Sequence, residues 1–277
     1  MAQLILTEIW IYPVKSLGGI RVKQASVLKK GLQYDRRYML VDQHNQFITQ
    51  RAVHELALFK LSMAEDGFLV SFKGDYIKLP PTPTVTGTTQ KVRIWNDTVD
   101  ASELDQQIND WFSHQLGFPC RLVYFPEDNE RLVDRNFVSG DEQVSLADGY
   151  PYLIIGQSSL DDLNSRLDKP VPMNRFRPNF VFAGGEAFGE DKWNDFTIGD
   201  NRFKGMKLCA RCTIPTVDQS TGVAGLEPLK ILATFRKNGS KVNFGQNLIP
   251  LDFSRVSEGD PISVVSYHPA LSLQNNI

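Results

Sequence analysis

Short strand-like segments separated by turn formers fill most of the first hundred residues, and they constrain the fold more than any other feature of the sequence. These segments are rich in β-branched and aromatic side chains, which pack well on a pleated sheet. Turn-forming steps such as Gly18-Gly19 and Asp66-Gly67 lie between several of them. The strand-like segments of this half are 4–12, 25–28, 37–42, 68–72 and 92–94. The pattern predicts a fold dominated by short strands.

One amphipathic helix follows these strands. Apolar residues recur every three or four positions over 104–116, which places them on one face of a helix. We predict that Ser102 caps the start of this helix and that Gly117 ends it.

The stretch 126–142 is charged and irregular, and we interpret it as the boundary between two domains, 1–125 and 126–277. After it, strands are predicted at 152–155, 180–183, 196–198 and 262–267, with a short helix at 159–167. Many short strands with two or three helices predict a β-rich α+β protein with a barrel-like architecture.

Composition excludes several classes of protein. Thirty basic residues against 32 acidic ones give a net charge of −2, whereas nucleic-acid-binding proteins usually carry a net basic face. No apolar run reaches the roughly 18–20 residues that span a bilayer. Three cysteines in 277 residues are too few for a disulfide framework. We therefore expect a cytoplasmic protein that binds neither nucleic acid nor membrane.

The sharpest local feature is Cys209-Ala-Arg-Cys212, which allows four interpretations. A structural zinc site needs four ligands, and no second pair has the required spacing. A redox dithiol should begin a helix, but 213–217 is β-branched and contains a proline, which predicts an extended segment. The pair is otherwise either two buried core thiols or the site of a single thiolate ligand to a metal. In that last case Arg211 would hold an anionic group.

Two further segments place basic side chains beside predicted strands. After the first strand, Lys15 and Ser16 offer donors to a phosphate, and Gly18-Gly19 would allow the backbone to approach it closely. Arg36, just before the strand at 37–42, could add a second cation. The alternative is that Lys15 is a solvated surface charge.

The segment 174–179 holds two arginines and two side-chain amides directly before the strand at 180–183. Pro178 fixes its own φ, which favours a rigid display of Arg177 and Asn179. The alternative is a turn at the start of a strand whose polar groups are satisfied within the protein.

The order of the motifs along the chain is more specific than any one of them. They are Tyr-Pro-Val-Lys-Ser at 12–16, Asp-Arg at 35–36, Asp-Gly-Tyr-Pro at 148–151, Asp-Leu-Asn-Ser-Arg-Leu at 162–167, Phe-Arg-Pro-Asn at 176–179, Cys-Ala-Arg-Cys at 209–212 and Thr-Val-Asp at 216–218. Together they resemble the MOSC family, the molybdenum-cofactor sulfurase C-terminal domain. The resemblance is to members with an extra N-terminal β-barrel domain, which include amidoxime-reducing components.

The resemblance implies a site for the molybdenum cofactor, Mo-molybdopterin. Cys212 matches the molybdenum ligand, and Lys15, Ser16 and Arg36 match positions that hold the cofactor phosphate. Positions around the pterin and the metal are matched by Asp148, Arg177, Asn179 and Arg211, and Asn247 falls near a further contact. After Asp218 the chain departs from the family, because it has Gln219-Ser220 where relatives often have Pro-Asp.

The implied activity is that of an oxidoreductase that removes an oxygen atom from an N-hydroxylated or N-oxide small molecule. Two other functions stay open: a sulfur or cofactor carrier with a persulfide on Cys212, and a non-catalytic cofactor-binding module. The chain has no Gly-x-Gly-x-x-Gly loop after a strand and too few cysteines for an iron–sulfur cluster. We therefore expect a separate electron-donor protein, such as a ferredoxin, a flavoprotein or a cytochrome.

Overall fold

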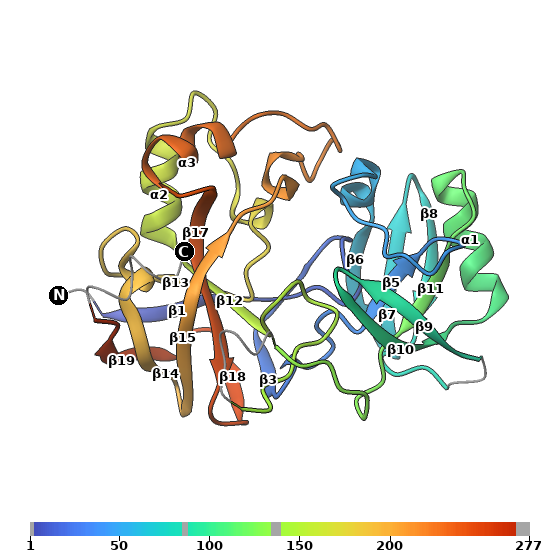
Figure 1. The fold of residues 1–277 in the computed structure, drawn as a ribbon, viewed down its shortest axis with the longest axis horizontal. Coiled ribbons are helices and arrows are strands. Elements are labelled where there is room, and N and C mark those ends of the chain that lie inside the picture. Colours follow the sequence, from blue (N-terminus) through green and yellow to red (C-terminus); the bar gives the residue numbers. More distant parts are fainter. Residues whose placement is uncertain (1–2, 85–87, 134–139, 270–277) are drawn as a thin grey trace.

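A closed ring of seven strands forms one side of the molecule (Figure 1). The computed structural model describes residues 3–84, 88–133 and 140–269. In order around the ring, the strands are β12 (Tyr152–Gly156), β13 (Phe180–Ala183), β1 (Leu4–Ile11), β19 (Pro261–Tyr267), β14 (Trp193–Ile198), β15 (Asn201–Ala210) and β17 (Lys241–Pro250), and β17 pairs with β12 to close it. The predicted β-rich, barrel-like fold is confirmed.

The first strand of the chain belongs to this barrel. β1 pairs antiparallel with β13 and with β19, so the barrel closes only when the start of the chain inserts between two late strands. Leu6 and Ile9 of β1 are fully buried, and a register shift lies between Leu6 and Glu8. The domain boundary near residue 126 stays a prediction, although β1, at the start of the segment 1–125, pairs with two strands that come after this boundary.

Short strands extend the barrel. β2 (Ile20–Val22) pairs with β1, and β16 (Lys237–Asn238) pairs with β17. A separate three-stranded sheet holds β18 (Arg255–Ser257), β3 (Gln24–Leu28) and β4 (Gly31–Leu32).

Two further sheets form the other side of the molecule, on the right in Figure 1. One has the order β5 (Tyr38–Val41), β11 (Arg121–Tyr124), β10 (Asp97–Glu103), β9 (Thr89–Ile94). The other has the order β6 (Lys60–Ala64), β7 (Gly67–Phe72), β8 (Asp75–Leu79). All the strands predicted from local sequence are present, with ends shifted by a few residues.

The predicted helix over 104–116 is α1 (Gln106–Leu116), but its cap was predicted wrongly. Ser102 lies in β10, whereas Asp105 accepts a hydrogen bond of 3.0 Å from the backbone N–H of Ile108. The helix therefore begins later than expected, because Asp105 offers its carboxylate to the first turn. The predicted end is confirmed, since Gly117 has a left-handed backbone with φ 74°.

The remaining helices lie beside the barrel. α2 (Gln157–Ser165) starts and ends two residues before the predicted helix, and α3 (Leu229–Phe235) was not predicted. Single 3₁₀ turns occur at η1 (His54–Leu58), η2 (Met173–Arg175), η3 (Gly189–Lys192) and η4 (Ile214–Thr216). No helix among the residues that the structure describes is long and apolar enough to cross a membrane.

The two sides of the molecule share the largest cluster of buried hydrophobic side chains. This cluster includes Leu6 and Phe203 of the barrel together with Phe68 and Phe112 of the other side. Because this cluster is continuous, loops from both sides are held in a fixed relation where they meet. Of the irregular stretch 126–142, residues 134–139 lie outside the described part of the chain.

Candidate functional site

A cavity of about 350 Å³ lies where loops from both sides of the molecule meet. All nine residues predicted to hold a cofactor line it: Lys15, Ser16, Arg36, Asp148, Arg177, Asn179, Arg211, Cys212 and Asn247. They come from segments that are far apart in the sequence, so only the closed fold brings them together. Their roles toward a cofactor stay predictions.

The loop after β1 enters the cavity because it is tied to β5. The backbone N–H of Lys15 donates to the carbonyl of Tyr38, and the backbone N–H of Tyr12 donates to the carboxylate of Asp35. Ser16, Arg36 and Arg177 all line the cavity in the left-handed region, with φ between 53° and 69°. Such backbone is uncommon for residues other than glycine and clusters at functional sites.

Gly18 and Gly19 have a different role from the one predicted. Neither lines the cavity. A Cβ on Gly18 would lie 2.6 Å from the carbonyl oxygen of Phe59, and a Cβ on Gly19 would lie 2.5 Å from the ring of Tyr12. These glycines therefore allow close packing inside the protein rather than close approach of a phosphate.

Two guanidinium groups lie against the ring of Tyr12. The Cζ atoms of Arg36 and Arg177 are 4.4 and 4.2 Å from its centroid. The fully buried carboxylate of Asp35 accepts a hydrogen bond of 2.6 Å from Arg36, and this charge raises the pKa of Arg36 although burial opposes it. Arg177 has no carboxylate partner among the residues that the structure describes, and burial and the charge of Arg36 lower its pKa to about 10. The cavity wall thus holds two adjacent cations with one buried counter-charge.

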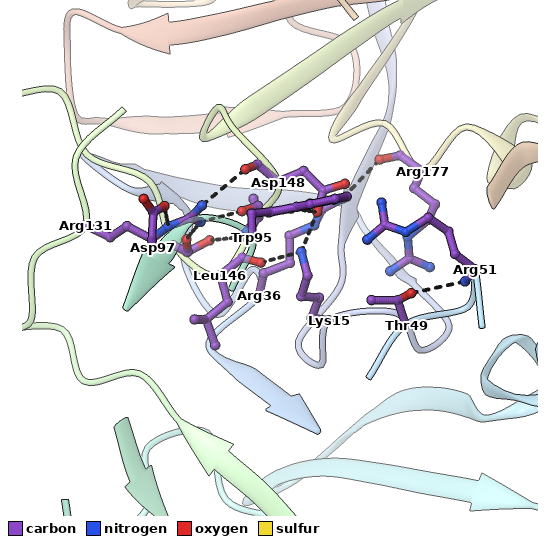
Figure 2. A network of polar contacts seen from close by, with 12 residues as sticks. Lys15, Arg36, Thr49, Arg51, Trp95, Asp97, Arg131, Leu146, Asp148 and Arg177 are labelled. Carbon is purple, nitrogen blue, oxygen red and sulfur yellow. Dashed lines mark hydrogen bonds and ion pairs between the residues drawn. The ribbon is translucent and has the colours of Figure 1, made fainter. Parts of the chain in front are cut away.

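Lys15 is buried and paired rather than solvated at the surface. Its ammonium donates to the carbonyl of Leu146 at 2.8 Å and to the carboxylate of Asp148 (Figure 2). Burial lowers the pKa of Lys15 to about 8, although the charge of Asp148 opposes this. Burial would raise the pKa of Asp148, but Lys15 holds it well below the usual range. Trp95 adds a hydrogen bond to the same carboxylate oxygen at 3.2 Å.

The two cysteines lie on the wall formed by the end of β15. Cys209 accepts a hydrogen bond of 3.0 Å from Arg211, whose other terminal nitrogen donates to the carbonyl of Phe176 at 2.7 Å. Cys212 is half-buried, lines the cavity and is a free thiol. Among the described residues no three His, Cys, Asp or Glu side chains are grouped so that they could hold a metal ion. The prediction that the segment after Cys212 is extended was wrong. Its proline lies within the 3₁₀ turn η4.

Two buried nitrogens in the cavity wall have no hydrogen-bond partner among the described residues. They are Nη2 of Arg177 and Nε of Arg211. A buried donor left unpaired costs about 1–3 kcal/mol. Six basic side chains line the cavity (Lys15, Arg36, Arg51, Arg177, Lys207 and Arg211) against the single carboxylate of Asp148. This donor set fits an anionic ligand with several acceptor oxygens, as the phosphate and pterin of the molybdenum cofactor would provide.

The two asparagines differ in what they contact. The side chain of Asn179 accepts from the backbone N–H of Leu153 and donates to the carbonyl of Trp10, both at 3.2 Å. It therefore ties β12 to β1 and shapes the cavity wall. Asn247 lies on β17, opposite Leu153 and Lys207 in the neighbouring strands.

Sequence reasoning missed several residues of the cavity. Arg51, Trp95, Tyr150 and Lys207 also line it. Tyr150 belongs to the motif Asp-Gly-Tyr-Pro at 148–151 but was not predicted as a site residue. The other three stand in no motif: Trp95, for example, lies in the turn between β9 and β10, and Lys207 lies within β15. Lys207 is also out of step with the other basic residues of β15, Arg202 and Lys204, so the sequence pattern does not show that its side chain meets a cavity.

Comparisons with known proteins show the family to which the chain belongs. Residues 3–119 match the family model of the MOSC N-terminal beta barrel domain, and residues 141–263 match that of the MOSC domain. The chain is 31% identical to mitochondrial amidoxime-reducing component 1 from Mus musculus over 93% of this chain and 81% of that protein. The Homo sapiens protein of the same name is also 31% identical, over 93% and 82%. A molybdenum cofactor sulfurase from Oryza sativa subsp. japonica is 30% identical over 94% of this chain but only 34% of that protein.

Proposed function

This chain belongs to the MOSC family, and we propose that it binds the molybdenum cofactor and works as an oxidoreductase on N-hydroxylated or N-oxide compounds. The relatives support the reaction class, because amidoxime-reducing components are among the proteins that it resembles over most of its length.

One observation carries the proposal. The half-buried thiol of Cys212 opens into the same basic cavity as the unpaired buried nitrogens of Arg177 and Arg211. A thiolate is a soft ligand that suits a soft or high-valent metal. The adjacent guanidinium groups suit the oxygens of an anionic organic cofactor.

We assign the protein groups as follows. Lys15, Ser16 and Arg36 hold the phosphate, and Cys212 supplies the thiolate ligand. The residues toward the pterin and the metal are Asp148, Arg177, Asn179, Arg211 and Asn247. When bound, the cofactor supplies two-electron oxygen-atom chemistry. The protein anchors it, limits access of water, and keeps the Lys15 proton beside the Asp148 carboxylate.

The proposal includes a separate electron donor, such as a ferredoxin, a flavoprotein or a cytochrome. An iron–sulfur cluster generally takes four cysteines, whereas the sequence has three, and two of these line the cavity. It also includes a reducing compartment such as the cytoplasm, because the proposed ligand has to remain a thiolate. A sulfur carrier with a persulfide on Cys212 and a non-catalytic cofactor-binding module are the alternatives.

Elemental and pterin analysis of the purified protein, followed by a turnover assay, tests the proposal. We expect near-stoichiometric molybdenum with pterin, and reduction of benzamidoxime to benzamidine by a chemical reductant. If the protein instead contains labile sulfane sulfur and no metal, it is a sulfur carrier and the proposed activity is wrong. Full cofactor without turnover of any N-hydroxylated compound would leave only the cofactor-binding module.

A further inference from the structure

Arg51 differs from the other arginines of the cavity in having no polar partner for its side chain. Its guanidinium forms no hydrogen bond or ion pair with any residue in the described part of the chain, and only its backbone N–H donates, to Thr49. The guanidinium groups of Arg36, Arg177 and Arg211 each donate at least one hydrogen bond within the protein. Arg51 therefore presents five N–H donors that the protein does not use.

The position of the Arg51 side chain is fixed by aromatic rings instead. Its Cζ lies 3.9 Å from the ring centroid of Trp95 and 5.8 Å from that of Phe47. A guanidinium stacked on an aromatic face is held in place while its edge remains able to donate. Trp95 in turn has a left-handed backbone with φ 57° and donates its indole N–H to Asp148. The ring on which Arg51 stacks is thus itself held in place by a hydrogen bond.

The nearby carboxylate does not neutralise Arg51. The Oδ1 atom of Asp148 already accepts from the ammonium of Lys15 and from Trp95 (Figure 2). The charge of Arg51 helps to lower the pKa of Asp148, but no ion pair forms between the two side chains. An anion entering beside Arg51 would therefore meet an uncompensated positive charge.

Arg51 and Trp95 lie at the rim of the cavity. Trp95 is 42% exposed, whereas Lys15 and Arg177 are 6% and 8% exposed. Of the groups assigned to the cofactor, Lys15, Ser16, Arg177 and Asn179 are buried, Asp148 is exposed, and the others are half-buried, as Arg51 is. Arg51 is therefore set apart by the exposed ring of Trp95 on which it stacks, and by a guanidinium that has no polar partner among the described residues.

We propose that Arg51, backed by Trp95, is a specificity-determining residue that binds an anionic group, a carboxylate or a phosphate, on the N-hydroxylated substrate. The inference rests on the proposed function and narrows its substrate class. An anionic substrate gains a charge-assisted hydrogen bond from Arg51 that a neutral analogue lacks. The expected discrimination is about tenfold or more in kcat/KM, the size of one such bond.

The test compares matched substrates under a chemical reductant, so that no donor protein is needed. Benzamidoxime is paired with 4-carboxybenzamidoxime, and N4-hydroxycytidine is paired with its 5′-monophosphate. We expect the anionic member of at least one pair to have the higher kcat/KM. The pair that shows this preference tells whether Arg51 binds a carboxylate or a phosphate. Arg51→Gln should bring that ratio close to one. Arg255→Gln, which removes an exposed charge outside the cavity lining, should leave it unchanged.

The outcomes separate the two proposals. If the cofactor-loaded wild-type protein turns over none of the four compounds, the proposed function itself is contradicted. Turnover with ratios near one in the wild type, or ratios unchanged in Arg51→Gln, would overturn the role of Arg51 and leave the function standing. Molybdenum and pterin contents are measured in every variant. A large loss of cofactor in Arg51→Gln would also overturn the inference, because it would assign Arg51 to the cofactor.

Discussion

The guanidinium of Arg36 donates a hydrogen bond of 3.2 Å to the backbone carbonyl of Arg177. The two residues are 141 positions apart in the sequence, and both have a left-handed backbone. Their contact joins the loop before β5 to the segment before β13 and places two cations on one wall of the cavity.

Removing a phosphate-binding cation should lower cofactor retention rather than the chemical rate. Each of Lys15 and Arg36 is proposed to make one charge-assisted contact, worth roughly 1.5–3 kcal/mol. Lys15→Ala and Arg36→Ala should therefore show reduced molybdenum occupancy with near-normal turnover per bound metal. Lys29→Ala, an exposed lysine outside the cavity lining, is the control. Full occupancy in both variants would place the phosphate elsewhere.

The two cysteines should respond differently to substitution. Cys212→Ser removes the proposed soft ligand, so we expect loss of bound molybdenum and of turnover. Cys209→Ser keeps an acceptor for the hydrogen bond from Arg211, so most of the cofactor and activity should remain. Metal analysis and turnover of the two variants check this. Equal and complete loss in both would favour a dithiol.

Binding of anions by the cofactor-free protein should weaken as pH rises through about 8. Burial lowers the pKa of Lys15 to about 8, so its ammonium loses its proton above that pH and its contact with an anion is lost. Sulfate is a suitable probe, because its own charge is constant over this range. Calorimetric titration at pH 7 and pH 9.5 should show weaker binding at the higher pH.

Lys15→Arg is the matched variant for this titration, since a guanidinium stays charged at both pH values. Its affinity for sulfate should change little between them. The same loss of affinity in Lys15→Arg as in the wild type would show that another group titrates.

Stability should fall between about pH 4.5 and pH 7 because of Glu190. Burial, and next the charge of Asp191, raise the pKa of Glu190 from 4.5 to about 7. The folded protein therefore holds a proton that the unfolded chain releases over this range, so stability decreases as pH rises, by up to about 3.5 kcal/mol. Thermal unfolding across this range measures the effect.

Glu190→Gln should flatten that pH dependence. The carboxylate accepts from the backbone N–H of Gly156 and the hydroxyl of Ser159, and a glutamine oxygen can still accept while its amide donates. If the variant loses stability with pH as steeply as the wild type, Glu190 is not the group that titrates.

Turnover should require an electron donor that the purified chain does not supply. Mixing cofactor-loaded protein with NADPH and benzamidoxime should give no reduction, whereas a chemical reductant or an added fraction that contains the donor should give turnover. Redox encounters are usually small and weak, so no stable partner should co-purify. Reduction by NADPH alone would contradict this expectation.

Local sequence patterns were sufficient for most of the secondary structure. The strand at 180–183 matches β13, and the end of α1 at Gly117 follows from its left-handed backbone. Local patterns failed at the start of α1, because Ser102 and Asp105 are both residues that cap helices well. Only the pairing of β10 with its neighbours places Ser102 in a strand. Motif residues were also found from sequence, because a resemblance in ordered motifs does not require knowledge of contacts.

The sequence by itself identified residues that line the cavity: Cys212 and the basic side chains in their motifs. Only the tertiary structure decided that Gly19 packs on Tyr12, that Asn179 ties two strands together, and that the guanidinium of Arg51 lines the cavity with no polar partner among the described residues. The physical reason is that these contacts are long-range. They form when β1 inserts between β13 and β19 and closes the barrel, which brings loops from both sides of the molecule to one cavity.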